Sequence, residues 1–201
     1  MRISMKDRMQ RGVTLIELAV VMAIVGIMAL FIAPAIGEWV DNFRIRQAAR
    51  DVSSDLQFAK MKAIGSGVRY AVVFNQIVGG TTYSYVIFPD YDNDLILDTA
   101  DYAYDLNGDG IMETVNETTN ILKLGLLGKN ISFDPDQGGG DGTDIPDVSG
   151  HPAIAFNRSG LPIEQSGAVT AQRNIYLKNT KNNKHIQVTI SPAGRIGINE
   201  Y

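Results

Sequence analysis

An uncharged, mostly apolar run of 20 residues lies near the N-terminus, from Leu18 to Gly37. As a helix it would be about 30 Å long, which is enough to cross the hydrocarbon core of a bilayer. The core of a secretory signal peptide is shorter, about 7–15 residues, and its cleavage site follows that core. The run therefore predicts a membrane-spanning helical segment over residues 13–37.

A carboxylate, Glu17, directly precedes this run. A charged side chain inside a membrane span costs about 2.5–3.5 kcal/mol on insertion scales, so an intramembrane glutamate is expected to be functional and to have a partner. A plain single-pass anchor is the alternative interpretation, but it explains neither Glu17 nor the glycine at position 12. Glu17 is therefore a candidate assembly residue.

Residues 1–12 form a short basic leader that ends in Gly12. Its charged residues are Arg2, Lys6, Arg8 and Arg11 against Asp7. The resulting net charge of +3 predicts a cytoplasmic N-terminus, with the C-terminal body on the other side of the membrane.

Helical periodicity continues well past the apolar run. Apolar residues recur at spacings of three and four: Ile45, Ala49, Val52, Leu56, Ala59 and Ala63. Residues 38–64 are therefore expected to be the amphipathic part of the same helix. A helix from Val13 to Ile64 would be about 78 Å long, so its second half must pack against a globular domain. Pro34 removes a backbone donor and predicts a kink.

After Gly65-Ser66-Gly67 the apolar pattern changes to a period of two, which indicates strands. Expected strands cover residues 68–75, 82–88, 121–127, 131–133, 153–156, 168–177, 185–190 and 195–198. Residues 67–201 are thus predicted to form an antiparallel β-domain on the helix, an α+β fold. The Gly/Asp-rich segment 134–150 predicts a mobile loop that contributes nothing to the core.

Composition excludes several classes of function. The chain has no cysteine, so it has neither disulfides nor a catalytic thiol nor a thiolate metal site. Without the leader it holds 14 basic and 21 acidic residues, a net charge of −7, which is unlike a polybasic nucleic-acid protein. No serine, histidine and carboxylate show a recognisable catalytic spacing, which disfavours a membrane-anchored hydrolase.

The segment Arg11-Gly12-Val13-Thr14-Leu15-Ile16-Glu17 resembles the class III signal of type IV prepilins and type II secretion pseudopilins. The resemblance implies that a prepilin peptidase cleaves after Gly12 and methylates Val13, although phenylalanine is commonest at that position. It also implies that Glu17 pairs with the terminal amine of a neighbouring subunit. The protein would lie in the bacterial inner membrane with a periplasmic body, and then enter a filament.

Three later segments are similar to the GspH/FimT family of minor pilins and pseudopilins: Asp55–Ile64, Ala155–Pro162 and Ile190–Ile196. The resemblance implies the pilin fold, a long N-terminal helix packed on an antiparallel sheet. It implies a structural subunit of a type IV pilus or type II secretion pseudopilus and no enzymatic activity. Its expected partners are other pilins or pseudopilins, the peptidase and an inner-membrane assembly platform.

A DNA-binding minor pilin of an uptake pilus is the alternative function. Some family members that serve uptake end in a Gly-Arg-x-Arg tail, whereas Gly194-Arg195-Ile196-Gly197 keeps only the first arginine. Arg195 is therefore a candidate DNA contact. Further cations that could contact phosphates on the last hairpin are Arg173, Lys178, Lys181 and Lys184, although a solvated hairpin face is the simpler interpretation.

The acidic stretch 90–117 is a candidate calcium site, because calcium takes several oxygen ligands from a loop with a tight glycine turn. The better set has Gly110 at the turn and comprises Asp105, Asn107, Asp109, Ile111 through its carbonyl, Glu113 and Asn116. A weaker set lacks the glycine and comprises Asp90, Asp92, Asp94, Asp98 and Asp101. The alternative is a connection of Asx turns, in which the side chains bond their own backbone.

Overall fold

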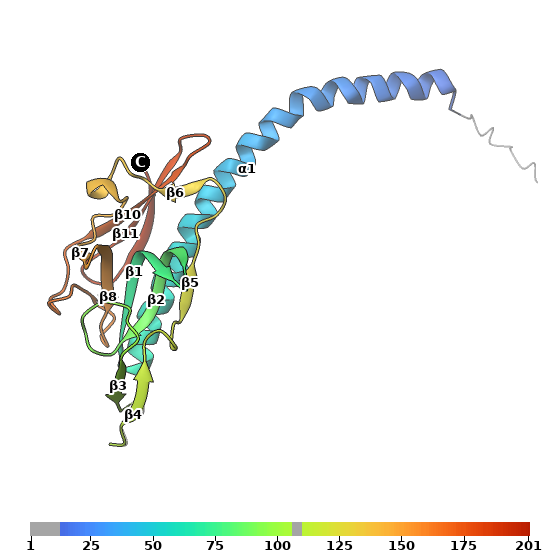
Figure 1. Cartoon of the computed structure of the whole chain (residues 1–201). Coiled ribbons are helices and arrows are strands. Elements are labelled where there is room, and N and C mark those ends of the chain that lie inside the picture. The colour runs from blue at the N-terminus through green and yellow to red at the C-terminus, as the bar shows by residue number, and fades with distance from the viewer. Residues whose placement is uncertain (1–12, 106–109) are drawn as a thin grey trace, which may run out of the picture. The chain divides into compact units, whose positions relative to one another are not determined.

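The computed structural model describes residues 13–105 and 110–201, apart from the side chains of residues 31–35. It divides into two compact units, Met1–Val40 and Asp41–Tyr201. One helix, α1 (Leu15–Ser66), has residues in both units (Figure 1). The sequence places this helix two residues too early at each end. The leader and two of the candidate calcium ligands, Asn107 and Asp109, lie outside the described residues.

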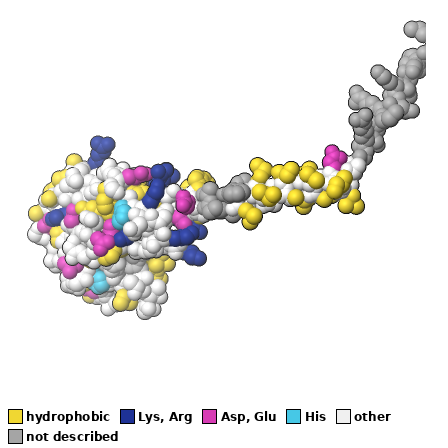
Figure 2. All heavy atoms as spheres, turned by 90° about the horizontal axis from the view of Figure 1, so that it is seen from above, with side chains coloured by type: hydrophobic (Ala, Val, Ile, Leu, Met, Phe, Trp, Pro, Cys, Tyr) yellow, Lys and Arg dark blue, Asp and Glu magenta, His cyan; other side chains and the backbone are white. Residues whose placement is uncertain are grey.

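In the first unit, the large apolar side chains of α1 are exposed. Between Val13 and Leu30 their exposed fractions run from 52% to 86%, and Figure 2 shows apolar side chains along this part of the helix. Within the part of the chain that the structure describes, no helix is both long and apolar enough to cross a membrane. Helix α1 includes Pro34 without interruption, and the kink there stays a prediction.

The second unit contains two larger antiparallel sheets and one short hairpin. The first sheet has the order β5-β2-β1-β8-β7, with β9 paired to β8; its strands are β1 (Arg69–Val78), β2 (Thr81–Asp90), β5 (Lys123–Gly125), β7 (Asp147–Val148), β8 (His151–Phe156) and β9 (Pro162–Ile163). The second sheet has the order β12-β11-β10-β6; its strands are β6 (Ile131–Phe133), β10 (Arg173–Asn179), β11 (His185–Ile190) and β12 (Ile196–Glu200). The hairpin pairs β3 (Asp101–Tyr104) with β4 (Glu113–Asn116).

The apolar stripe of α1 forms the centre of the main core. All six residues predicted to face the domain, from Ile45 to Ala63, are at most 1% exposed. They share one cluster with residues of both larger sheets, including Phe74, Phe156 and Leu177. This confirms that the second half of the helix packs on the β-domain.

Strand β1 contributes to two cores, because successive side chains of a strand point to opposite faces of the sheet. Val72 and Phe74 belong to the cluster on α1. Ala71 and Val73 belong to a second cluster on the other face, which the chain after β2 covers with Leu95. The start of the acidic stretch therefore closes the second core.

Two sequence expectations are wrong in detail. The segment 134–150 does contribute to the core: Ile145 joins the cluster on α1 and Val148 joins the second cluster. It also contains a short 3-10 helix, η1 (Gly138–Gly140), and strand β7. The expected strand 168–177 begins only at Arg173, because Val169 instead forms a bridge with Ile163 at β9.

Candidate functional site

Glu17 lies in the first turn of α1, where its backbone N–H donates to Thr14 Oγ1 at 3.3 Å. The carbonyl of Thr14 accepts from Leu18 N at 3.1 Å. A threonine followed three residues later by a glutamate is the pattern of a capping box, and an acid near a helix N-terminus also complements the helix dipole. Sequence reasoning missed this second role of Glu17, although the spacing is visible. Gly12 lies outside the described residues, and Val13 is 72% exposed.

The upstream acidic residues are brought together. Asp90, Asp92 and Asp94 each place one carboxylate oxygen within 4.8 Å of the others. Asp90 is buried, with Oδ2 lying 3.4 Å from Arg69 Nε. The hydroxyl of Tyr102 donates to Asp98 at 2.7 Å and to Asp92 at 3.0 Å. Four carboxylates of this set therefore lie in one cluster.

Several aspartates of this cluster form Asx turns, in which the side chain accepts a hydrogen bond from the backbone N–H two residues further on. Asp94 Oδ1 accepts from Ile96 N at 2.7 Å, and Asp98 Oδ1 accepts from Ala100 N at 2.9 Å. Asp101 Oδ1 accepts from Asn116 Nδ2 at 3.3 Å. These carboxylates thus accept hydrogen bonds from donors within the chain, which is the arrangement that the Asx-turn alternative predicts.

The downstream set is described only in part, because Asn107 and Asp109 lie outside the described residues. Asp105 Oδ2 accepts from Gly110 N at 2.9 Å, and the Asn116 amide donates to the carbonyls of Thr99 and Ala100 at 2.6 and 3.0 Å. Glu113 lies in β4, and the Ile111 side chain is exposed. Among the described residues, the carboxylates that lie within 4.8 Å of one another belong to the loop that the sequence ranks second.

Among the described acids of the stretch, Glu117 is the most buried, with no exposed surface. Its Oε1 accepts from Tyr91 N at 2.9 Å. The pKa of Glu117 is raised to about 8, chiefly by burial and also by the nearby charges of Asp90 and Asp92, while the backbone N–H groups of Tyr91 and Asp98 oppose the rise. Burial likewise raises the pKa of Asp90 to about 6, opposed mainly by Arg69. The sequence did hold a signal for this burial. Glu117 follows Val115 by two positions, and alternate residues of a strand point to the same face, so both are buried.

The candidate DNA-binding cations mostly have carboxylate partners. Arg173 binds Glu164 at 2.5 Å. Lys178 binds Asp136 at 2.9 Å, and Lys181 binds Asp41 at 2.6 Å. Arg195 is exposed, and its backbone N–H closes a turn on Ser191 Oγ. Three of the four hairpin cations are therefore already neutralised within the chain.

The three segments that resemble the GspH/FimT family meet at one point. Lys60 of α1 donates from Nζ to the carbonyl of Gly194 at 2.9 Å. Gly160 and Gly194 both have positive φ, and a Cβ on Gly194 would lie 2.3 Å from the Gly160 carbonyl oxygen. A Cβ on Gly160 would lie 2.7 Å from Ile64 Cδ1. We call this contact of helix and two turns the glycine junction.

Comparison with known families agrees with this arrangement. The model of the Type II transport protein GspH matches residues 48–194, which contain all of the glycine junction. The chain belongs to the GspH family. The prokaryotic N-terminal methylation motif matches residues 7–33. The family expected from the sequence is therefore confirmed, as is the α+β class of the fold.

This GspH-family chain is similar to proteins of both pili and secretion systems. It is 32% identical over 154 residues to the type IV major fimbrial protein FimA of Dichelobacter nodosus, covering 69% of this chain and 91% of that protein. Two solved structures resemble it at low identity. The type IV minor pilin FimU of Pseudomonas aeruginosa is 14% identical, with a TM-score of 0.41, 80% of this chain and 92% of that one covered. The minor pseudopilin EpsH of the Vibrio cholerae type 2 secretion system is 12% identical, with a TM-score of 0.43 and coverage of 78% and 97%.

Proposed function

We propose that this chain is a minor pilin or pseudopilin, a structural subunit that assembles through α1 into a type IV pilus or type II secretion pseudopilus. The observation that carries the proposal is the methylation motif at residues 7–33 on the same chain as the GspH match at 48–194. Helix α1 contributes residues to both matched regions. Its first part has exposed apolar side chains, and its second part has a buried apolar stripe.

The exposed apolar side chains between Val13 and Leu30 suit two successive environments. Before assembly, we infer that the inner membrane surrounds them and that the body lies in the periplasm. After assembly, the same side chains pack against the helices of neighbouring subunits, with an assembly platform guiding the transfer. Large exposed apolar surfaces normally mark such interaction sites.

Cleavage after Gly12 would create a positive amine on Val13. Glu17 of a neighbouring subunit supplies the opposite charge inside an apolar bundle, where an unpaired charge is costly. The pair therefore fixes the axial register of each subunit against the next. In this mechanism the chain carries out no chemical step itself.

The first test is the mature N-terminus. We expect mass spectrometry of the membrane-extracted protein to show a chain that begins at Val13 and carries one added methyl group. Gly12→Leu should keep the whole leader, because the bulky side chain blocks the cleavage site. A mature chain that begins after Gly37 would contradict the proposal, since α1 would then lose its apolar part.

The DNA-uptake alternative gains no support from the hairpin, because Arg173, Lys178 and Lys181 bind carboxylates. DNA affinity that falls steeply with salt would revive it.

Calcium binding stays a prediction, and the two candidate loops make it testable. If calcium binds, the full chain in mild detergent should melt at a higher temperature in millimolar calcium than in chelator. A ligand bound only to the folded state stabilises by about 2.7 kcal/mol at a hundredfold excess over its Kd. Asp92→Asn should remove this gain if the clustered carboxylates bind the ion, and Asp105→Asn should remove it if the downstream loop does. Identical melting curves would leave the Asx-turn interpretation.

A further inference from the structure

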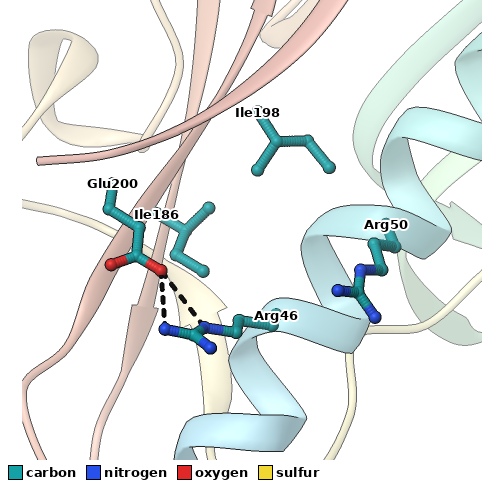
Figure 3. Close-up of a pocket in the computed structure, with 5 residues that line it drawn as sticks. All are labelled: Arg46, Arg50, Ile186, Ile198 and Glu200. Carbon is teal, nitrogen blue, oxygen red and sulfur yellow. Dashed lines mark hydrogen bonds and ion pairs between the residues drawn. The ribbon is translucent and has the colours of Figure 1, made fainter.

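A groove lies between α1 and β12, the last strand of the second sheet. Its volume is about 400 Å³, and its lining residues are Arg46, Arg50, Ile186, Ile198 and Glu200. Figure 3 shows Arg46 and Arg50 on successive turns of α1, with the side chains of Glu200 and Ile198 on the other side of the groove. Cations from the helix thus face a wall that the strand provides.

The groove holds more positive charge than its own carboxylate neutralises. Arg46 binds Glu200 Oε1 at 2.9 Å, but the two side chains are 54% and 64% exposed. Exposed ion pairs of this kind contribute only about 0–1 kcal/mol, so another carboxylate can share Arg46 with Glu200 at little cost. Among the described residues, neither Arg50 nor Lys184 forms an ion pair, and Lys184 lines an adjoining cavity together with Arg46 and Glu200. We call the five lining residues and Lys184 the basic groove.

Strand β12 is a free edge beside the basic groove. Among the described strands it pairs with β11 alone. Just before β12 begins, Ser191 N donates to the carbonyl of Arg195 at 2.9 Å. Because bonded and non-bonded positions alternate along an antiparallel pair, the backbone groups of Ile196, Ile198 and Glu200 point away from β11. They are therefore free to bond to a strand from another chain.

The same three residues of β12 turn their side chains toward α1. Ile196 packs on the main core, and Ile198 and Glu200 line the groove. Side chains directly opposite each other on neighbouring strands share a face, so alternate side chains of an added strand would also face α1. Such side chains are spaced by about 6.6 Å, whereas Arg46 and Arg50 are separated by about 6 Å along the helix axis. Two acidic residues with one residue between them can thus meet both arginines.

We propose that the basic groove binds an extended acidic segment of a different pilin or pseudopilin subunit. The segment adds to β12 as a strand and directs carboxylates at alternate positions toward Arg46 and Arg50. Three cations against one carboxylate select an acidic segment, and the free edge selects an extended one. The inference rests on the proposed function, in which a minor subunit meets neighbours of other sequence, and it specifies the chemistry of one such contact.

A synthetic peptide that alternates threonine and glutamate is the first probe, and its binding to the full-length chain in mild detergent is measured by fluorescence anisotropy. We expect Arg46→Glu with Arg50→Glu to weaken binding at least about tenfold, because like charges then face each other, and to favour a peptide with lysine in place of glutamate. The matched control, Lys129→Glu with Arg158→Glu, changes the charge equally at exposed cations that line neither cavity. Equal affinity of the two double variants, or no binding by the unchanged chain, would overturn the proposal.

Hydrogen exchange of the same complex tests the added strand. The amides of Ile198 and Glu200 should exchange at least about tenfold more slowly with the peptide bound, because each gains a backbone partner. Gly197 and Asn199 occupy the bonded positions opposite β11, so their exchange should change little. Binding without slower exchange at Ile198 and Glu200 would contradict strand addition. A single-stranded oligonucleotide that binds as tightly as the acidic peptide would make the groove a nucleic-acid site and the proposal wrong.

Assembled filaments test the identity of the partner. The chain has no cysteine, so Ile198→Cys can carry a single benzophenone maleimide. On illumination we expect a product with a different subunit, linked through a segment whose carboxylates alternate with other residues. A product of two copies of this chain, or a linked segment without such carboxylates, would contradict the inference. A chain that is cleaved at Val13 and enters filaments, yet gives neither this product nor peptide binding, would leave the proposed function intact and remove the groove from it. A chain that is never cleaved and never enters filaments would remove the function itself.

Discussion

A chain carrying Glu17→Val should reach the membrane and be cleaved at Val13, yet enter filaments at least tenfold less often than the unchanged chain. The valine makes the apolar run longer and easier to insert, because the cost of a charge in the membrane disappears. The neighbouring amine at Val13, however, loses its counter-ion inside the helix bundle. The measurement is the amount of the chain in sheared filaments relative to the amount in membranes.

Glu17→Gln separates the charge from the capping role. Glutamine can still complete a capping box with Thr14, so α1 keeps its first turn, but it cannot neutralise an amine. We expect Glu17→Gln to fail in assembly as Glu17→Val does. The control Thr14→Ala should weaken the cap by about 1 kcal/mol and still assemble. If Glu17→Gln enters filaments normally, Glu17 acts through the cap and the proposed ion pair is wrong.

Glu117→Gln should stabilise the protein at neutral pH and flatten its dependence on pH. The pKa of Glu117 is raised from 4.5 to about 8 in the folded state, chiefly by burial. Below pH 4.5 both states hold the proton, whereas between pH 4.5 and 8 only the folded state keeps it. The free energy of unfolding therefore falls as pH rises through this window, by at most about 1.4 kcal/mol per pH unit for this residue.

The measurement is urea unfolding of the full chain in mild detergent and chelator at pH 5 and pH 7.5. Chelator is included so that no cation lowers the pKa of the acidic cluster. Asp134→Asn is the matched control, because Asp134 is equally buried, yet its pKa is lowered: the backbone N–H of Asp136 and the side chains of Tyr201 and His185 bond its charged form and outweigh burial. That variant should lose stability by about the same amount at both pH values, because Asp134 is charged in both the folded and the unfolded state above its ordinary pKa of 3.8. If the Glu117→Gln chain keeps the pH dependence of the unchanged protein, the group that keeps its proton in the folded state is not Glu117.

Elements in which a regular spacing of apolar residues continues over several repeats were predictable from the sequence. The six residues of the helix stripe all lie in the core, since a spacing of three and four leaves one face for them. Strand β11 was expected over 185–190 and has those bounds. The hairpin of β3 and β4 was missed because it is short and its strands carry acids as well as apolar residues.

The candidate sites were harder to predict because they depend on distant partners. The sequence shows Lys178 and Lys181 as neighbours of other cations, but not that Asp136 and Asp41 neutralise them from other parts of the chain. It shows nine acids in residues 90–117, but not which of them are buried. Glu117 has no exposed surface and a raised pKa, whereas Asp92 is exposed, and this difference in burial is visible only in the folded structure.

The glycine junction shows why the residues shared with the GspH family do not reveal which machine the subunit serves. Lys60, Gly160 and Gly194 hold two turns against α1: a Cβ on Gly194 would collide with the Gly160 carbonyl, and the positive φ of Gly160 favours glycine there. Packing alone therefore requires these residues, whichever machine the subunit serves. A chain could move between a pilus and a secretion apparatus while keeping all of them. Adaptation to a new machine has more freedom in the hairpin of β3 and β4, which pairs with no other sheet among the described strands.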